Sequence, residues 1–422
     1  MLLLPVEIWH REGPSSILLA LELASRGYTV CIGAQPSIQS LGARLPFIAV
    51  YLDKSLSKAK EGWYKRLPKS LKVISHDIEF TGITNPNLYA RARFSQKNID
   101  RSSAIIFHNE LEKNFIHRSF DNVTSPPFIG SHKFEFIAKF SSLLYKEKAD
   151  HLREKYGDFT FIPSNFGGAF REGGLEVLFK WADDHFESEL CKSFKNKILA
   201  REKVRDEFIV AIREIAIRNP HRSYILRPHP TEEVTSWRKV DLPDNVIIEF
   251  EGPLLPYVVA CSQLMHAGCT SVIDGALLNK KQNVFLPDFR DVSQWPFHNI
   301  ADQCDNNLKD YIRAAASVDS ANIPIFNSES TFLPLSDSYF SNFSYFLSNY
   351  VEKKSSTFVA KCLLRLISLF TRNSFNDRKY SAKHHLEILK IIDSLVLLMG
   401  LESKIDIDNI SKSRCILLSK RL

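Results

Sequence analysis

The chain lacks several features that would place it in a specialised class of protein. No stretch of its 422 residues reaches the roughly 18 consecutive apolar residues of a membrane-spanning helix. Its seven cysteines are scattered and include no Cys-x-x-Cys pair, so neither a disulfide framework nor a zinc site is indicated. No low-complexity segment is present. We therefore expect a soluble, globular protein of the reducing cytoplasm.

The first residues also lack the pattern of a secretory leader. "MLLLPVEIWHRE" has a short apolar run, no basic residue before it and acidic residues straight after it. A signal peptide needs a basic start and a longer apolar region. The segment is more typical of a first β-strand.

Positive charge is scarce outside the C-terminal part of the chain. From Leu333 to Leu422 there are fourteen Lys and Arg against eight Asp and Glu, which accounts for six of the net charge of +7. The rest of the chain is close to neutral. A nucleic-acid-binding surface across the body of the protein is therefore not indicated.

The apolar runs are short and alternate with amphipathic stretches, which predicts parallel sheets with crossover helices. A charged stretch that begins near residue 139 interrupts the alternation, and it restarts at "FTFIPSNFGG". A chain of 422 residues is longer than one that usually folds around a single hydrophobic core. We therefore expect an α/β fold with two Rossmann-like doubly wound domains facing a cleft. The predicted domains are residues 1–138 and 139–330, followed by a basic helical tail, 331–422.

The tail contains one strongly amphipathic segment, residues 358–372. In "FVAKCLLRLISLFTR" the polar residues recur at helical spacing and form a narrow basic stripe on an otherwise apolar helix. They are Lys361, Arg365, Ser368 and Arg372. Such a helix either lies on an anionic membrane surface or packs back onto the domains with its cations in water.

A histidine between two prolines follows the predicted strand "SYILRP". Pro228 and Pro230 keep the backbone extended on either side of His229, because proline restricts both itself and the residue before it. The acids Glu232 and Glu233 are interpreted as the start of the next helix, which leaves no set of metal ligands. His229 is either a donor to a phosphate or a turn residue without a ligand.

A second candidate site lies in "LMHAGCTSVIDGALLNK". The pattern predicts a strand, a tight turn at Gly268, and a helix whose first turn carries Thr270 and Ser271. Free amides at a helix start attract anions, although Ser and Thr are also ordinary helix caps. Asp274, one turn further, either faces a ribose hydroxyl or favours the helix dipole.

The loop "PSNFGGAF" ends the first strand of the predicted second domain. Gly167 and Gly168 would allow the backbone to approach a ligand closely, and Asn165 precedes them. Arg227, at the end of "SYILRP", is a further candidate for contact with the donor or acceptor.

The ordered motifs resemble those of the bacterial surface carbohydrate biosynthesis protein family. They are "PVEIWHRE", "YLDKSLS", "HDIEFTG", "GSHKFE", "RPHPTEEVTSW" and "HAGCTSVIDGALLNKK", which together span about residues 1 to 330. The family is similar to two-domain GT-B glycosyltransferases and, more distantly, to sialyltransferases and Kdo transferases that use CMP-sugars. The resemblance implies that His229, Pro230, Thr270 and Ser271 hold the nucleotide phosphate.

In the predicted acceptor-side domain, "HDIEFTG" stands where the family has a more acidic block. The resemblance places Asp77 and Glu79 as candidate catalytic acids, one of which would deprotonate the acceptor hydroxyl or attack the sugar. Alternatively, they cap the following turn. Glu7, Arg11 and Glu12 are candidates for donor or acceptor contact, or form an internal Arg–Glu pair. Lys133 of "GSHKFE" retains the positive charge of the family's pattern.

The implied reaction is transfer of Kdo or another nonulosonate from a CMP-activated donor to a glycan or lipid-linked glycan acceptor. A single phosphate can be stabilised by a histidine and a helix start, so we expect no metal and no cofactor beyond the CMP-sugar co-substrate. The chain spells Asp-x-Asp only at 406–408, in the tail. A CDP-polyol phosphotransferase and a non-catalytic partner subunit remain alternatives, and the expected location is the cytoplasm, with or without contact to the inner face of the membrane.

Overall fold

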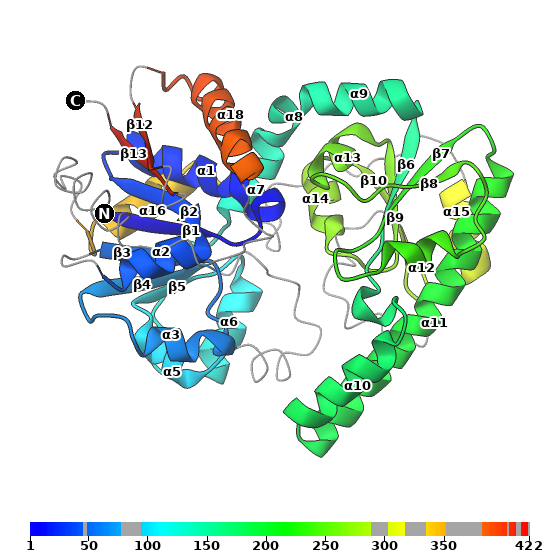
Figure 1. Cartoon of the computed structure of the whole chain (residues 1–422), viewed down its shortest axis with the longest axis horizontal. Coiled ribbons are helices and arrows are strands. Elements are labelled where there is room, and N and C mark those ends of the chain that lie inside the picture. Colours follow the sequence, from blue (N-terminus) through cyan, green and yellow to red (C-terminus); the bar gives the residue numbers. More distant parts are fainter. Residues whose placement is uncertain are drawn as a thin grey trace. The chain divides into compact units, whose positions relative to one another are not determined.

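The computed structural model describes residues 1–44, 49–76, 94–287, 303–316, 335–351, 382–402, 405–410 and 415–420. These residues form two compact units (Figure 1). The first unit takes in the described residues up to Phe140 together with those from residue 335 onward, and the second runs from Ser141 to residue 316. The division between the units falls near residue 140, and the described residues from 335 onward, which the sequence analysis assigned to a separate tail, group with the first unit.

The first unit is built on a seven-stranded sheet in the order β12-β13-β2-β1-β3-β4-β5. Its strands are β1 (Leu2–Val6), β2 (Val30–Ala34), β3 (Ala49–Asp53), β4 (Leu71–His76), β5 (Ala104–Ile106), β12 (Ile405–Ile410) and β13 (Cys415–Lys420). Strands β1 to β5 are parallel. The chain order reverses between β1 and β3, and in doubly wound sheets ligands bind at the carboxyl ends of the strands at such a reversal.

Helices cover both faces of this sheet (Figure 1). They are α1 (Trp9–Ser25), α2 (Gln35–Gly42), α3 (Glu61–Tyr64), α5 (Gln96–Arg101), α6 (Glu110–Ser119), α7 (His132–Lys139), α16 (Tyr339–Leu347) and α18 (Ala382–Leu398), with a 3₁₀ turn at Lys58–Lys60. Alternate strand residues such as Leu3 and Tyr51 pack on the side of α2, α3, α5 and α6. Leu4 and Leu52 point to the opposite face, toward α1 and α16. This period of two is expected for strands buried on both faces.

The C-terminal segment is only partly helical. It contains α16 and α18, but its last described residues form β12 and β13, which are antiparallel to one another, and β13 is antiparallel to β2. Leu417 lies opposite Cys31 and is buried, so β13 covers what would otherwise be the edge of the parallel sheet. The Asp406 to Asp408 pair belongs to β12. The predicted basic stripe at 358–372 lies outside the described residues.

The second unit has a six-stranded, wholly parallel sheet in the order β11-β10-β9-β6-β7-β8. Its strands are β6 (Phe159–Pro163), β7 (Ser223–Arg227), β8 (Val246–Ile248), β9 (Gln263–His266), β10 (Lys281–Phe285) and β11 (Gln303–Asp305). Counted along the chain, this is the 3-2-1-4-5-6 order of a dinucleotide-binding fold, and the order reverses between β6 and β9.

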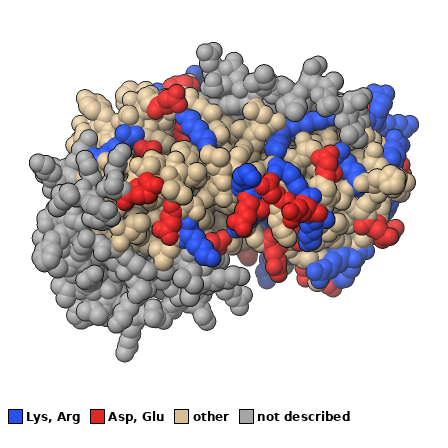
Figure 2. All heavy atoms as spheres, turned by 90° about the horizontal axis from the view of Figure 1, so that it is seen from above, with Lys and Arg blue, Asp and Glu red and all other residues tan. Residues whose placement is uncertain are grey.

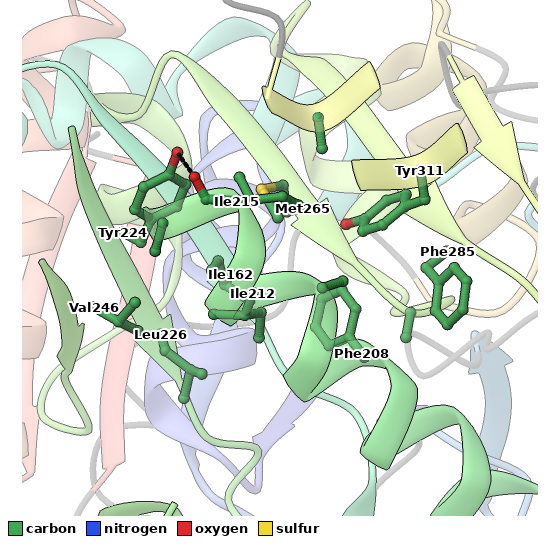
Figure 3. Packing of buried hydrophobic residues seen from close by; sticks show 14 of the residues in the cluster. Ile162, Phe208, Ile212, Ile215, Tyr224, Leu226, Val246, Met265, Phe285 and Tyr311 are labelled. Atoms are coloured by element: carbon green, nitrogen blue, oxygen red, sulfur yellow. Dashed lines mark hydrogen bonds between the residues drawn. The ribbon is translucent and has the colours of Figure 1, made fainter. Parts of the chain in front are cut away.

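Two groups of helices bury this sheet. The helices are α8 (Ser141–Leu144), α9 (Lys146–Tyr156), α10 (Gly174–His185), α11 (Ser188–Arg218), α12 (Val234–Arg238), α13 (Leu255–Ala260), α14 (Ser271–Leu277) and α15 (Leu308–Ala316), with a 3₁₀ turn at Gly167–Ala169. Figure 3 shows Phe208 and Ile212 of α11 packed with strand residues such as Leu226. Helices α9 and α13 pack on the other face, against Phe161 and Ile225. The two predicted doubly wound α/β domains are therefore confirmed.

The described surface carries charges of both signs. Figure 2 shows acidic and basic side chains interspersed over the face drawn. No helix among the described residues combines the length and the apolar character needed to span a bilayer.

Candidate functional site

Three loops of the second unit meet at the carboxyl edge of its sheet, where the strand order reverses. Hydrogen bonds join them: the Asn165 side chain, after β6, donates to the carbonyl of Gly268, after β9, at 3.3 Å. The amide of His229, after β7, donates to Ser164 Oγ at 3.0 Å. The loop after β6 thus connects the other two. The predicted residues at 164–168, 229 and 268–271 lie on neighbouring loops of one edge of the sheet.

The buried side chain of Glu232 stabilises the loop after β6. Its buried carboxylate accepts hydrogen bonds from the amides of Phe166 (2.6 Å) and Gly167 (3.1 Å), and from Trp237 Nε1 (2.8 Å). Ser164 Oγ donates to the same carboxylate. Three donors from the loop after β6 and one from helix α12 therefore converge on one side chain. The sequence predicts that Glu232 and Glu233 start the next helix, but the helix begins at Val234 and the Glu232 carboxylate is buried.

His229 is held in a defined orientation. Its Nδ1 accepts a hydrogen bond from the Thr231 amide at 3.2 Å and contacts Thr231 Oγ1 at 2.8 Å. Because an acceptor nitrogen carries no proton, the proton of the neutral ring is assigned to Nε2, which becomes a donor. The ring is partly exposed at the end of β7. The prediction that the two prolines present His229 at a strand end is consistent with this geometry, and phosphate binding by His229 stays a prediction.

The loop after β9 is shaped by a neutral histidine. Burial lowers the pKa of His266 to about 4, and its Nδ1 accepts the Cys269 amide at 3.2 Å. Helix α14 begins at Ser271, and Thr270 precedes it without making a side-chain capping bond. Thr270 is exposed and Ser271 Oγ lies 3.3 Å from Cys269 Sγ. Ordinary capping by Thr270 is therefore not what holds this turn. Asp274 lies in the first helical turn, half-buried.

The glycines after β6 differ in their role. Gly167 has φ of +62°, a conformation that side chains rarely adopt, and a Cβ there would lie 3.6 Å from Thr231 Oγ1. Gly168 has an ordinary φ and belongs to the same 3₁₀ turn.

Arg227 donates to the carbonyl of Glu251 at 2.8 Å and to that of Gly252, with its guanidinium over the Tyr257 ring. It has a structural role, and its predicted ligand contact stays a prediction.

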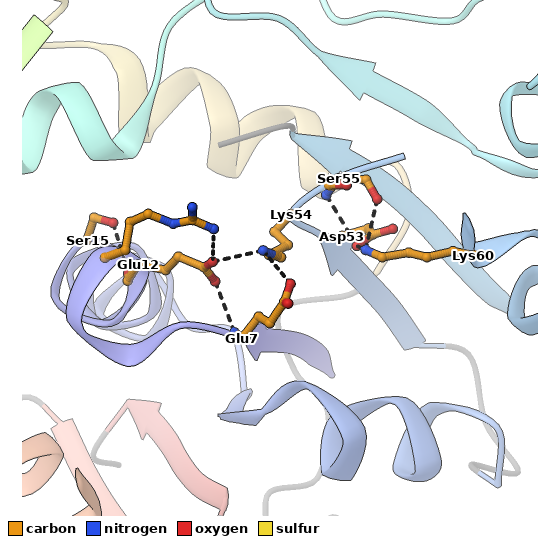
Figure 4. Close-up of polar contacts among 8 residues, drawn as sticks. Glu7, Glu12, Ser15, Asp53, Lys54, Ser55 and Lys60 are labelled. Carbon is orange, nitrogen blue, oxygen red and sulfur yellow. Dashed lines mark hydrogen bonds and ion pairs between the residues drawn. The ribbon is translucent and has the colours of Figure 1, made fainter. Parts of the chain in front are cut away.

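A buried ion network occupies the corresponding reversal in the first unit (Figure 4). Lys54 Nζ, at the end of β3, lies 2.7 Å from Glu7 Oε2 and 2.8 Å from Glu12 Oε1. The other oxygen of Glu12 accepts the Glu7 amide at 3.0 Å. Lys54 is 5% exposed and Glu12 is 1% exposed, whereas Glu7 is 33% exposed. The Arg11–Glu12 pair allowed by the sequence exists at 3.3 Å, but Lys54, which the sequence analysis did not select, is the main partner.

Three buried histidines lie beside this network. His76 ends β4, His108 follows β5, and His132 starts α7; the His76 ring centre is 5.0 Å from that of His108 and 5.1 Å from that of His132. Lys54, His76 and His132 line a cavity of about 20 Å³. Among the described residues, no three His, Cys, Asp or Glu side chains are grouped so as to hold a metal ion. The cluster was missed in the sequence because its members are far apart in the chain.

The histidines make the first unit sensitive to acid. Burial, and then the neighbouring imidazoles, lower the pKa of His76 well below its usual value, and burial lowers that of His132 to about 3. Below pH 6.5 the unfolded chain binds protons that the folded unit does not, so stability falls as the pH falls. We expect up to about 1.4 kcal/mol per pH unit for each histidine. Urea unfolding at pH 7, 6 and 5 measures this slope.

The variant His132→Asn should reduce the slope by up to about 1.4 kcal/mol per pH unit, because it removes one of the two histidines whose pKa is lowered by folding. His151→Asn, which changes an exposed histidine, is the control. A slope that His132→Asn leaves unchanged would show that His132 is not the group being titrated.

The remaining predicted residues of the first unit are only partly described. Lys133 follows His132 in the first turn of α7, where its amide donates to Ser131 Oγ at 3.3 Å, and its side chain is partly exposed. Asp77 and Glu79 lie outside the described residues. Their assignment as catalytic acids therefore stays a prediction.

No family model matches the chain, and no curated protein matches it. Among solved structures, the chain is similar to the GtfA/B complex (10% identity, 87% of this chain and 60% of that one, TM-score 0.31) and to TarM (9%, 75% and 54%, TM-score 0.35). It is also similar to UDP-GlcNAc 2-epimerase from Neisseria meningitidis bound to UDP-GlcNAc (13%, 83% and 99%, TM-score 0.46).

The chain thus spans 60% and 54% of the lengths of the first two solved proteins. At such low identities and TM-scores, the similarity says nothing about substrate or reaction.

Proposed function

We propose that the protein is a GT-B-type glycosyltransferase of surface polysaccharide biosynthesis. It transfers a sugar, Kdo or another nonulosonate, from a CMP-activated donor to a glycan acceptor. The observation that carries the proposal is the meeting of the loops after β6, β7 and β9 at the reversal of a 3-2-1-4-5-6 sheet, with His229 oriented by Thr231. The motif resemblance supplies the nature of the donor.

The donor nucleotide is expected to lie across these loops. Strands β7 and β9 are separated by β6, so their carboxyl ends lie about 10 Å apart, given the usual strand spacing. That span suits a phosphate with its ribose. His229 Nε2 donates to the phosphate from one side, and the start of α14, with Thr270 and Ser271, faces it from the other.

The same groups assist departure of CMP. As the bond between the sugar and the phosphate breaks, negative charge grows on the phosphate oxygens. A donor already oriented toward them stabilises this charge without having to reorganise. The acceptor hydroxyl is deprotonated by Asp77 or Glu79, a contribution typically worth ~10² to 10⁴ in rate.

The first unit supplies the acceptor side in this proposal. Glu7 is the more accessible member of the buried network at its sheet reversal, and Lys54 fixes it in place. A carboxylate held in this way can accept hydrogen bonds from glycan hydroxyls. The proposed acceptor is a glycan or a lipid-linked glycan, which residues 358–372 would bring within reach by contact with the inner face of the membrane.

Mass analysis of the transferred group tests the proposal. Purified protein is incubated with a candidate acceptor and CMP-Kdo, another CMP-nonulosonate or CDP-glycerol. We expect the acceptor to gain the mass of the sugar from one of the CMP-sugars. Gain of a phosphoglycerol mass would favour a polyol phosphotransferase, and transfer from a UDP- or GDP-sugar alone would contradict both.

Removal of the His229 ring should slow the same reaction. We expect His229→Ala to lower kcat/KM by about 10- to 100-fold, since a charge-assisted hydrogen bond is worth roughly 1.5–3 kcal/mol. His221→Ala, which changes an exposed histidine just before β7, is the matched control. Equal activity of both variants and the unaltered protein would refute the assignment of His229.

A further inference from the structure

Arg201 of helix α11 is a cation that has no hydrogen-bond partner among the described residues of the second unit. Its Nε is buried and unpaired, while the side chain as a whole keeps intermediate exposure. Neither a hydrogen bond nor an ion pair connects Arg201 to any of the described residues. Arg222 and Arg227 of the same unit differ, because they donate to Thr160 and to the Glu251 carbonyl, respectively. Burying the Nε–H group without an acceptor is costly to the folded protein.

The end of the Arg201 side chain lies at the meeting point of the three loops. A Cβ on Gly167 would be 3.9 Å from Arg201 Nη1 and 3.6 Å from Thr231 Oγ1, so the guanidinium and the residue that orients His229 both lie beside Gly167. The Glu232 carboxylate and the Cys269 thiol are also near enough to act on its charge. Arg201 therefore borders the loops after β6, β7 and β9 together.

Glu232 attracts Arg201 but does not accept a hydrogen bond from it. The carboxylate already receives the Phe166 and Gly167 amides, Ser164 Oγ and Trp237 Nε1. Its charge keeps the guanidinium close, and its oxygens are committed to other donors. The N–H groups of Arg201 are thus held at the site with their hydrogen-bonding capacity unused.

We propose that Arg201 is a phosphate-binding residue of the donor site, acting beside His229. This inference rests on the proposed function, which it deepens by naming a third group that recognises the nucleotide. A guanidinium presents its donors in a planar fork that matches phosphate oxygens, and it remains charged in proteins. The phosphate supplies the hydrogen-bond acceptors that the described residues do not offer to Arg201.

Calorimetric titration of CMP and of inorganic phosphate tests the assignment. We expect Arg201→Met to lower the affinity for CMP by about 10- to 100-fold, and to weaken phosphate binding as well. Arg201→Lys keeps the positive charge but not the planar fork of donors. Its affinity for CMP should therefore lie between those of Arg201→Met and the unaltered protein. Arg218→Met, at the exposed end of the same helix, is the control and should bind as the unaltered protein does.

Thermal unfolding without ligand separates a binding role from a structural one. Because Arg201 donates no hydrogen bond to the described residues and is held only by the charge of Glu232, Arg201→Met should lower Tm slightly at most, while the rise in Tm caused by CMP is largely lost. A clear fall in Tm without ligand, or CMP and phosphate affinities equal to those of the unaltered protein, would overturn the inference.

The two proposals can fail separately. If the unaltered protein binds phosphate but not CMP, and Arg201→Met loses phosphate binding, the CMP donor is wrong and the role of Arg201 stands. If CMP binds equally to the unaltered protein and to Arg201→Met, only the role of Arg201 is wrong. Binding of neither probe to the unaltered protein would contradict both.

Discussion

Replacing Glu232 with alanine is expected to lower the free energy of unfolding of the second unit by about 3–5 kcal/mol. The carboxylate accepts four hydrogen bonds, from Ser164, Trp237 and the amides of Phe166 and Gly167. Its loss leaves the Phe166 amide and Trp237 Nε1 buried without this acceptor. It also leaves Arg201 without the charge that holds it near the loops.

Urea unfolding followed by tryptophan fluorescence measures this effect, since the buried Trp237 donates directly to Glu232. Glu232→Gln keeps one acceptor oxygen and should lie between the alanine variant and the unaltered protein. Glu233→Ala removes the exposed neighbouring acid and serves as the control. A loss below about 1 kcal/mol in Glu232→Ala, a value ordinary for surface changes, would mean that the loops do not depend on this carboxylate.

Replacing Lys54 with methionine is expected to destabilise the first unit by a similar amount, about 3–5 kcal/mol. Lys54 is the cation between Glu7 and Glu12, and Glu12 is 1% exposed. Without Lys54, a buried carboxylate loses its main counter-charge. Methionine preserves most of the apolar stem, so the loss reflects the missing charge rather than a cavity.

A double-mutant cycle separates the ion pair from general packing. Lys54→Met combined with Glu12→Gln should recover part of the stability lost in Lys54→Met alone, because the uncompensated charge is then removed. Lys113→Met, which breaks a more exposed pair with Glu110, should cost less than about 1 kcal/mol. If the double variant is as unstable as the sum of the two single variants, the two residues are not coupled.

The parallel core of both units could be predicted from local patterns. Short buried runs such as "LLLPV" and "FTFIP" alternate with amphipathic helices, and the charged stretch near residue 139 marks the boundary. The strands β12 and β13 could not be predicted in this way. Leu417 pairs with Cys31 across most of the length of the chain, and nothing in the basic C-terminal segment indicates such a partner.

The candidate site, too, could be predicted from local sequence patterns only in part. His229 and Thr270 both lie at the carboxyl edge of the sheet because residues that follow buried parallel strands gather there, and their part in binding stays a prediction. Glu232 and Arg201 were missed because the sequence does not show in which direction each side chain points. One of two consecutive acids points inward, and one of the many charged residues of α11 reaches the loops.

Lys54 and the three histidines were missed for a related reason. Each lies at or next to the end of a strand or the start of a helix, where polar residues are common. Only the strand order brings the ends of β1, β3 and β4 together and shows that these residues are buried neighbours.

A crystal structure of the protein soaked with CMP tests directly whether the second unit binds the donor nucleotide. We expect the phosphate to lie at the carboxyl edge of the second unit's sheet, within hydrogen-bonding distance of His229 Nε2 and facing Thr270 and Ser271. CMP bound elsewhere, or with its phosphate turned away from His229, would contradict this expectation.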